Sequence, residues 1–139
     1  VDKMTLAALE GTLMHYLKGK DELNKVPVIR DLLQSKDELK LRSERFKEKL
    51  NNTCDSYHIN ITEGTSQVGG GTMPEVLLPT FVVVLKHNAI TVENLAKILR
   101  IHHTPAIIVR IQRDEILLDL RTVNIEEEEI IIKALASIK

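Results

Sequence analysis

The sequence is poor in aromatic residues, which make up 3% of its 139 residues, and it contains no tryptophan. Proteins that bind single-stranded nucleic acid commonly stack the bases on aromatic rings, and this chain has few rings to offer. Its core must instead be built from leucine, isoleucine, valine and alanine. The formal net charge of −1 also lacks the basic excess expected of an autonomous nucleic-acid-binding domain.

Cysteine is scarce as well, because Cys54 is the only one and no internal disulfide can form. This cysteine usage is typical of a protein from a reducing cytoplasm. No apolar run reaches the roughly 18 residues that a membrane-spanning helix needs, and the N-terminus shows no signal-peptide pattern. We therefore expect a soluble, cytoplasmic protein that does not associate with membranes.

Hydrophobic periodicity predicts helices in the first part of the chain. Leucines recur at helical spacing over residues 3–18, and a shorter helix follows at about residues 21–33. Ser35 fits the first position of a capping box that opens a third helix, which should end near Leu50. We interpret residues 1–52 as a helical connecting segment.

After this segment the period changes from helical to two. Residues 57–62 alternate as a strand, and residues 80–86 form an apolar run typical of a buried strand. Residues 106–120 alternate around a tight turn, which predicts a two-stranded hairpin. Thr91 and Asn124 are suitable N-cap residues for two further helices.

This order of elements predicts an α+β fold. Residues 53–139 should form a small C-terminal domain, in which helices cover one face of a mostly antiparallel sheet. The chain begins at Val1 rather than methionine and leads directly into a predicted helix. We therefore expect a detached piece of a larger enzyme.

The most distinctive segment lies between the first two predicted strands. Its glycines, Gly69, Gly70 and Gly71, permit positive φ angles and a close approach of a ligand to the backbone. Gln67 beside them offers both a hydrogen-bond donor and an acceptor. The segment is not a phosphate-binding motif, since no helix start follows and no Lys-Ser or Lys-Thr pair closes it. Taken alone, it fits either a flexible connection or a wall of a binding site.

Arg121 is the second candidate for a binding role. It ends a predicted strand just before a helix N-terminus, a place that suits an anionic group. An ion pair with Asp119, or with the acidic first turn of the last helix, is the structural alternative.

The other reactive side chains form no catalytic or metal-binding pattern. The histidines lack a zinc-type spacing, Cys54 has no partner cysteine, and no Ser-His-Asp or Cys-His arrangement can be assembled. We therefore predict no catalytic and no metal-binding residue. His87 is notable because it ends the buried strand that follows the glycines. The helix before Leu50 mixes basic and acidic residues, which is typical of a solvated face, with an RNA contact as the alternative.

Three segments together resemble one family. They are VDKMTLAALE at residues 1–10, EGTSQVGGG at residues 63–71 and LLDLRTV at residues 117–123. They are similar to the C-terminal part of bacterial selenocysteine synthase, the L-seryl-tRNA(Sec) selenium transferase. The resemblance extends over nearly the whole chain, and the glycine segment is its most specific part.

The resemblance implies a pyridoxal-phosphate enzyme of the aspartate-aminotransferase-like fold that assembles into ring-shaped homo-oligomers. Such enzymes convert seryl-tRNA(Sec) to selenocysteinyl-tRNA(Sec) with selenium from selenophosphate. In the family the lysine that holds the cofactor lies upstream of the segment that residues 1–10 match, and Lys3 matches the helix after the large domain. This fragment alone should therefore bind no cofactor and be inactive.

The resemblance also gives the two candidate sites a role. Gln67, Gly69, Gly70 and Gly71 become a wall of the substrate site, and enzymes of this fold often contribute an arginine from a strand end, as at Arg121. Two other interpretations stay open at this point. One is the small domain of another pyridoxal-phosphate-dependent sulfur or selenium lyase, and the other is a non-catalytic α+β module that binds RNA or protein.

Overall fold

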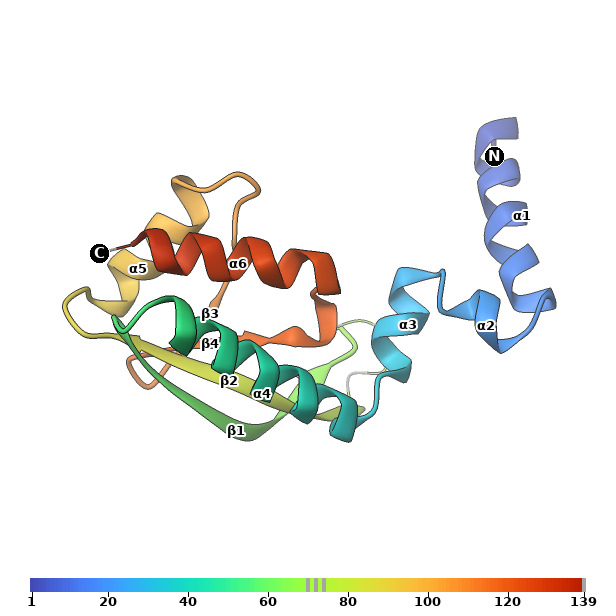
Figure 1. Ribbon diagram of the computed structural model, residues 1–139. Helices are drawn as coiled ribbons and strands as arrows, with labels where there is room; N and C mark the ends of the chain where they lie inside the picture. The colour runs from blue at the N-terminus through green and yellow to red at the C-terminus, as the bar shows by residue number, and fades with distance from the viewer. Residues whose placement is uncertain (70, 72, 74, 139) are drawn as a thin grey trace. The chain divides into compact units, whose positions relative to one another are not determined.

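The computed structural model describes residues 1–69, 71, 73 and 75–138, and it contains two compact units, Val1–Gln34 and Ser35–Lys139 (Figure 1). Across the described residues, no helix is both long enough and apolar enough to cross a membrane.

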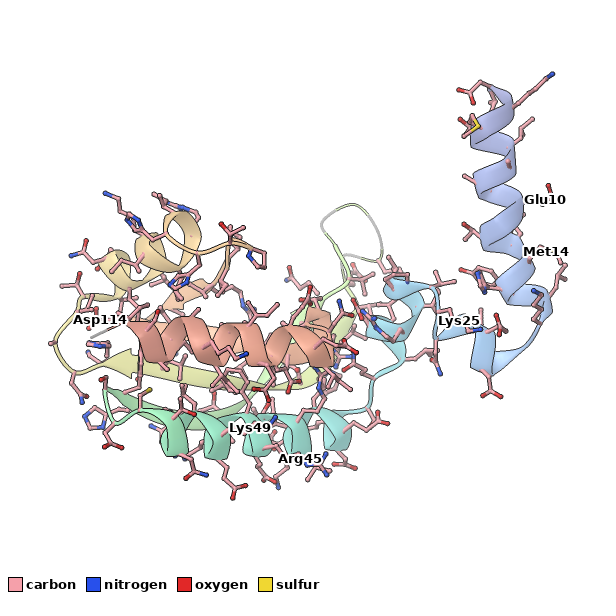
Figure 2. All side chains as sticks on the ribbon, turned by 45° about the horizontal axis from the view of Figure 1, so that its top comes forward. Glu10, Met14, Lys25, Arg45, Lys49 and Asp114 are labelled. Atoms are coloured by element: carbon pink, nitrogen blue, oxygen red, sulfur yellow. The ribbon has the colours of Figure 1, made fainter. Side chains whose placement is uncertain are left out.

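The first unit consists of helices α1 (Lys3–Leu17), α2 (Lys20–Leu23) and α3 (Pro27–Leu33). The sequence predicted one helix for the second and third of these. Pro27 separates them, because it takes the first position of α3, where its missing N–H needs no partner. Side chains such as Met14 project from all around α1 (Figure 2), and none of the residues of α1 is buried.

The second unit is built on a four-stranded antiparallel sheet with the strand order β1-β2-β4-β3, which confirms the predicted α+β class. The strands are β1 (Tyr57–Gln67), β2 (Leu77–His87), β3 (Arg110–Gln112) and β4 (Glu115–Asp119).

The strand lengths differ from those that the sequence predicted. β1 continues to Gln67 and β2 begins at Leu77, so that the pairing of these two strands runs well past the buried positions. Residues 63–67 are mostly polar and resemble a loop in sequence, but ladder hydrogen bonds join backbone groups and need no apolar side chain. β3, in contrast, pairs only over Arg110–Gln112 and is shorter than the alternation predicted.

Helices α4 (Lys36–Thr53), α5 (Val92–Ile101) and α6 (Ile125–Ser137) lie on one side of this sheet (Figure 1). Because side chains alternate along a strand, every second residue faces these helices. The strands contribute these residues to the core: Tyr57, Ile59, Val83, Leu85, Ile116 and Leu118. The helices contribute, among others, Phe46, Leu50, Leu95, Leu99, Ile132 and Leu135.

Helix α4 begins at the capping box that the sequence predicted. The Ser35 hydroxyl accepts from the Glu38 amide, and the Glu38 carboxylate accepts from the Ser35 amide at 2.8 Å. The bonds that this carboxylate accepts from the amide and the hydroxyl of Ser35 lower the pKa of the Glu38 carboxyl. The helix buries Phe46 and Leu50 with the sheet, so the division between the units falls after Gln34. The sequence suggested instead a connecting segment that reaches residue 52.

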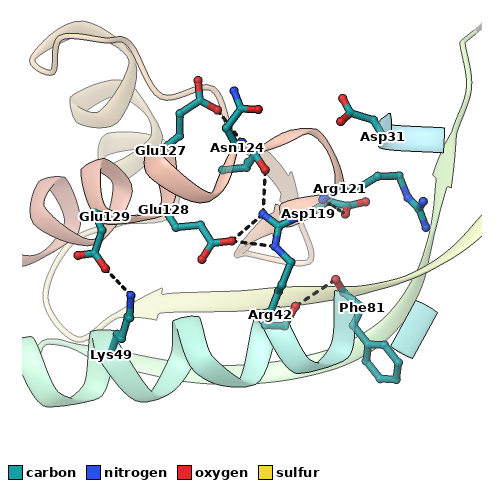
Figure 3. Close-up of polar contacts among 12 residues, drawn as sticks. Asp31, Arg42, Lys49, Phe81, Asp119, Arg121, Asn124, Glu127, Glu128 and Glu129 are labelled. Atoms are coloured by element: carbon teal, nitrogen blue, oxygen red, sulfur yellow. Dashed lines mark hydrogen bonds and ion pairs between the residues drawn. The ribbon is translucent and has the colours of Figure 1, made fainter. Parts of the chain in front are cut away.

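A buried ion pair joins α4 to the first turn of α6 (Figure 3). Arg42 donates from Nε and Nη2 to Oε1 of Glu128 at 2.9 and 2.6 Å, and Nη2 also donates to the Val123 carbonyl at 2.8 Å. Lys49, about two turns after Arg42 on α4, forms a second, exposed pair with Glu129, the residue next to Glu128. The acidic first turn of α6 therefore holds this helix against α4, besides complementing the helix dipole.

The ring of His87 closes the turn that follows β2. Its Nδ1 atom accepts from the amides of Ala89 and Ile90, both at 3.1 Å. The ring is buried and meets Tyr57 edge-on, with the centroids 4.9 Å apart. The Tyr57 hydroxyl donates to the Leu135 carbonyl at 2.9 Å, and burial raises the pKa of this phenol.

We predict that Arg42→Ala lowers the free energy of unfolding by about 3 kcal/mol, because it leaves the Glu128 carboxylate buried without its partner. Urea unfolding followed by circular dichroism measures this change. Arg45→Ala removes an exposed arginine from the same helix and should change stability by less than about 0.5 kcal/mol. Equal losses in the two variants would contradict a special role of the buried pair.

We also predict that the imidazole proton of His87 is on Nε2 and not on Nδ1, since an Nδ1 atom that accepts from two amides carries no proton. Long-range proton–nitrogen NMR spectra of the imidazole distinguish the two tautomers. His87→Phe keeps a ring against Tyr57 but leaves two amides without their acceptor, and should destabilise the protein by about 1–2 kcal/mol. His58→Gln, at an exposed position of β1, is the control.

Candidate functional site

The glycine segment forms the tip of the hairpin between β1 and β2. Gln67 pairs with Leu77 at the last position of the ladder and is exposed, so it is a strand residue and not the loop residue that the sequence suggested. Gly69 has a φ of +153°, which side chains rarely permit, and a side chain at Gly69 or Gly71 would meet no atom within 4 Å. Gly70 lies outside the described residues. At Gly69 the glycine is therefore needed for backbone freedom rather than for lack of space.

Arg121 lies in the short 3-10 helix η1 (Leu120–Thr122), between β4 and α6. Its side chain is buried, with only 4% of the residue exposed, and it extends to the base of the glycine hairpin. There Nη2 donates to the Pro79 carbonyl at 2.7 Å, and Nε donates to the Ser66 hydroxyl at 3.3 Å. The structure thus brings together the two sites that the sequence picked out separately.

Asp119 connects these groups. Its Oδ2 atom accepts from the Ser66 hydroxyl at 2.5 Å, and its Oδ1 atom accepts from the Thr80 hydroxyl at 3.0 Å and from the Arg121 amide at 3.1 Å. Arg110 approaches the same carboxylate, with Nη2 3.8 Å from Oδ2. Ser66, Thr80, Asp119 and Arg121 form what we call the Asp119 cluster, which joins β1, β2, β4 and η1 (Figure 3 shows Asp119 and Arg121).

The Asp119 cluster lies on the face of the sheet opposite α4, α5 and α6. Val83 and Leu118 belong to the core beneath these helices, so their neighbours Val82 and Asp119, which pair with each other, point the other way. Thr80 follows the same alternation as Val82. The cluster is therefore separate from the hydrophobic core beneath these helices, although Thr80, Val82 and Arg121 are buried as well.

Sequence reasoning found Arg121 and Asp119 but not the roles of Ser66 and Thr80. It offered an Arg121–Asp119 ion pair as the structural alternative. The structure shows a bond from the Arg121 amide to Asp119, and bonds from the guanidinium to Ser66 and Pro79. Period-two alternation could place Thr80 on one face. It could not place Ser66 beside Asp119, because that depends on the register of two strand pairs.

The described lysine side chains lie at the surface. Wherever a lysine side chain is described, it is exposed or half-buried, and none is enclosed. Hydrogen bonds from Lys49 to Glu129 and from Lys86 to Asp114 raise the pKa of both ammonium groups. A lysine that forms a Schiff base needs a neutral amine, which is favoured by a lowered pKa. Within residues 1–69, 71, 73 and 75–138, no three His, Cys, Asp or Glu side chains come together as metal ligands.

Comparisons with known proteins give a consistent result. The SelA family model, described as L-seryl-tRNA selenium transferase, matches residues 1–124. The L-seryl-tRNA(Sec) selenium transferase of Clostridium botulinum strain Hall is 41% identical over 133 residues, which cover 96% of this chain and 29% of that protein. The Carboxydothermus hydrogenoformans enzyme is 41% identical over 92% of this chain and 27% of its own length. The Clostridium perfringens enzyme is 38% identical over 99% and 30%.

The chain thus spans less than a third of the length of these relatives. The family model nevertheless covers most of the chain, and the identity extends over nearly all of it, which confirms the resemblance that its three segments indicated. The chain belongs to the L-seryl-tRNA selenium transferase family.

Proposed function

We propose that this chain is the C-terminal domain of a pyridoxal-phosphate-dependent transferase that converts seryl-tRNA(Sec) to selenocysteinyl-tRNA(Sec) with selenophosphate. The family match over residues 1–124 carries this proposal, since its members are selenium transferases of selenocysteine biosynthesis. The chain spans less than a third of its relatives, so its own part is to complete a site that other segments share. We place the whole enzyme in the cytoplasm, as a homo-oligomer.

We propose that Gln67, Gly69, Gly70, Gly71 and Arg121 form one wall of the substrate site. The described members of this set support the role, because the Arg121 guanidinium is bonded to Ser66 and Pro79 on the two strands that flank the glycine segment. An aminoacyl ester has no free carboxylate for an arginine to bind. The phosphates of the tRNA terminus and of selenophosphate are the anions that a fixed positive charge beside the loop would attract.

We propose further that this chain does not hold the cofactor itself. Bound pyridoxal phosphate supplies the electron sink of the reaction, and the protein must supply a lysine and a phosphate cradle for it. The exposure of the described lysines, and the raised pKa of Lys49 and Lys86, support a cofactor lysine outside this chain. The chain's contribution is then to enclose and orient the substrate.

The isolated chain should therefore form no specific Schiff base with pyridoxal phosphate. Mixing the two and recording absorbance before and after borohydride reduction tests this expectation, with peptide mapping to locate any reduced adduct. Weak labelling spread over several exposed lysines is the expected result. A stoichiometric adduct on one lysine would overturn the assignment of the cofactor to another part of the enzyme.

In the full-length enzyme, Arg121→Ala should lower kcat/KM by about tenfold or more, the effect expected when a charge-assisted contact to an anion is lost. Steady-state assays that vary seryl-tRNA(Sec) and selenophosphate separately would show which substrate is affected. Arg100→Ala, at an exposed position of α5, is the matched control. Unchanged turnover in a folded Arg121→Ala enzyme would remove Arg121 from the substrate site.

A further inference from the structure

We propose that Ser66 and Asp119 are positioning residues, which fix Arg121 to Ser66 and Pro79 on the two paired strands that flank the glycine segment. The consequence for catalysis rests on the proposed function of the loop, whereas the positioning itself rests on the contacts within the Asp119 cluster.

The Ser66 hydroxyl is the link between arginine and carboxylate. A hydroxyl has one proton to donate and lone pairs with which to accept. Here it donates to Oδ2 of Asp119 at 2.5 Å and accepts from Nε of Arg121 at 3.3 Å. The hydroxyl therefore links the guanidinium to the carboxylate. Removing this single oxygen would take a partner from the guanidinium and from the carboxylate at once.

The Asp119 carboxylate fixes the other end of this link. It also accepts from the Thr80 hydroxyl at 3.0 Å and from the Arg121 amide at 3.1 Å, which ties it to β2 and to η1. Its side chain is only 14% exposed, so these bonds are shielded from water and worth more than surface contacts. The carboxylate thereby holds both the backbone and, through Ser66, the side chain of Arg121.

This arrangement acts on the loop because it holds both of its stems. Ser66 is the residue before Gln67, which closes the ladder, and Pro79 lies on the returning strand, where its carbonyl accepts from Arg121 at 2.7 Å. Glycines place few restrictions on their own backbone. The Asp119 cluster thus holds Ser66 and Pro79, one on each of the two strands that flank the glycine segment, on the face away from the helices.

The test is hydrogen–deuterium exchange combined with kinetics in the full-length enzyme. Ser66→Ala should speed the exchange of backbone amides in residues 67–77 by about fivefold or more, because a lost hydrogen bond of about 1 kcal/mol makes opening of the stems easier. The KM of the substrate that this wall binds should rise more than kcat falls. Ser66→Thr, which keeps the hydroxyl, should restore both values. Thr65→Ala removes an exposed hydroxyl from the opposite face and is the matched control.

A second variant keeps the experiment decisive. Asp119→Asn should speed the exchange in the same peptide, with Asp114→Asn at an exposed turn as its control. If Asp119→Asn does not fold, the Ser66 series decides alone, since it changes one partly exposed oxygen. Unchanged loop exchange in Ser66→Ala, or no recovery in Ser66→Thr, would overturn the positioning role. Faster exchange with unchanged kinetics would support positioning and would instead remove the loop from the substrate site.

Discussion

The antiparallel pairing of β1 with β2 runs from Tyr57↔His87 to Gln67↔Leu77, and its register decides which side chains meet on each face of the sheet. On the helix side it brings the Tyr57 ring into contact with the His87 imidazole. On the other side it brings Ser66 close to Asp119. A shift of β1 by one residue would turn its side chains to the opposite faces, which would remove Tyr57 from the core and separate Ser66 from Asp119. Both the packing and the candidate site therefore depend on this one ladder.

The two faces of the sheet differ in the side chains that they carry. Beneath the helices, aliphatic side chains exclude water, and the Arg42–Glu128 pair fixes α6 to α4. On the opposite face, a small set of hydroxyl, carboxylate and guanidinium groups is joined by hydrogen bonds that restrict these side chains. Burial gives the domain its stability, and the polar network gives one edge of it a defined shape. The substrate-site wall that we propose lies at that edge.

Much of the fold could be predicted from the sequence, because its signals are local. The capping box at Ser35, the N-cap at Asn124 and the apolar run of β2 each indicate an element without reference to the rest of the chain. The polar end of β1 could not be predicted, since it is a strand only because its backbone pairs with β2. The sequence likewise identified Arg121 and the glycines as candidates, but not the residues that join them. A hydrogen bond such as Ser66–Asp119 links positions 53 residues apart, and only the register of the sheet brings them together.

Helix α1 differs from the sheet in how little of it is buried. Its 15 residues include none that is buried, and Leu6, Leu9 and Leu13 are each more than half exposed. A helix of that length is only marginally stable in water without tertiary contacts. We therefore expect the sheet and its three helices to unfold together, and α1 to open at little cost in free energy. In an isolated chain, the amides of α1 are the ones that exchange with solvent first.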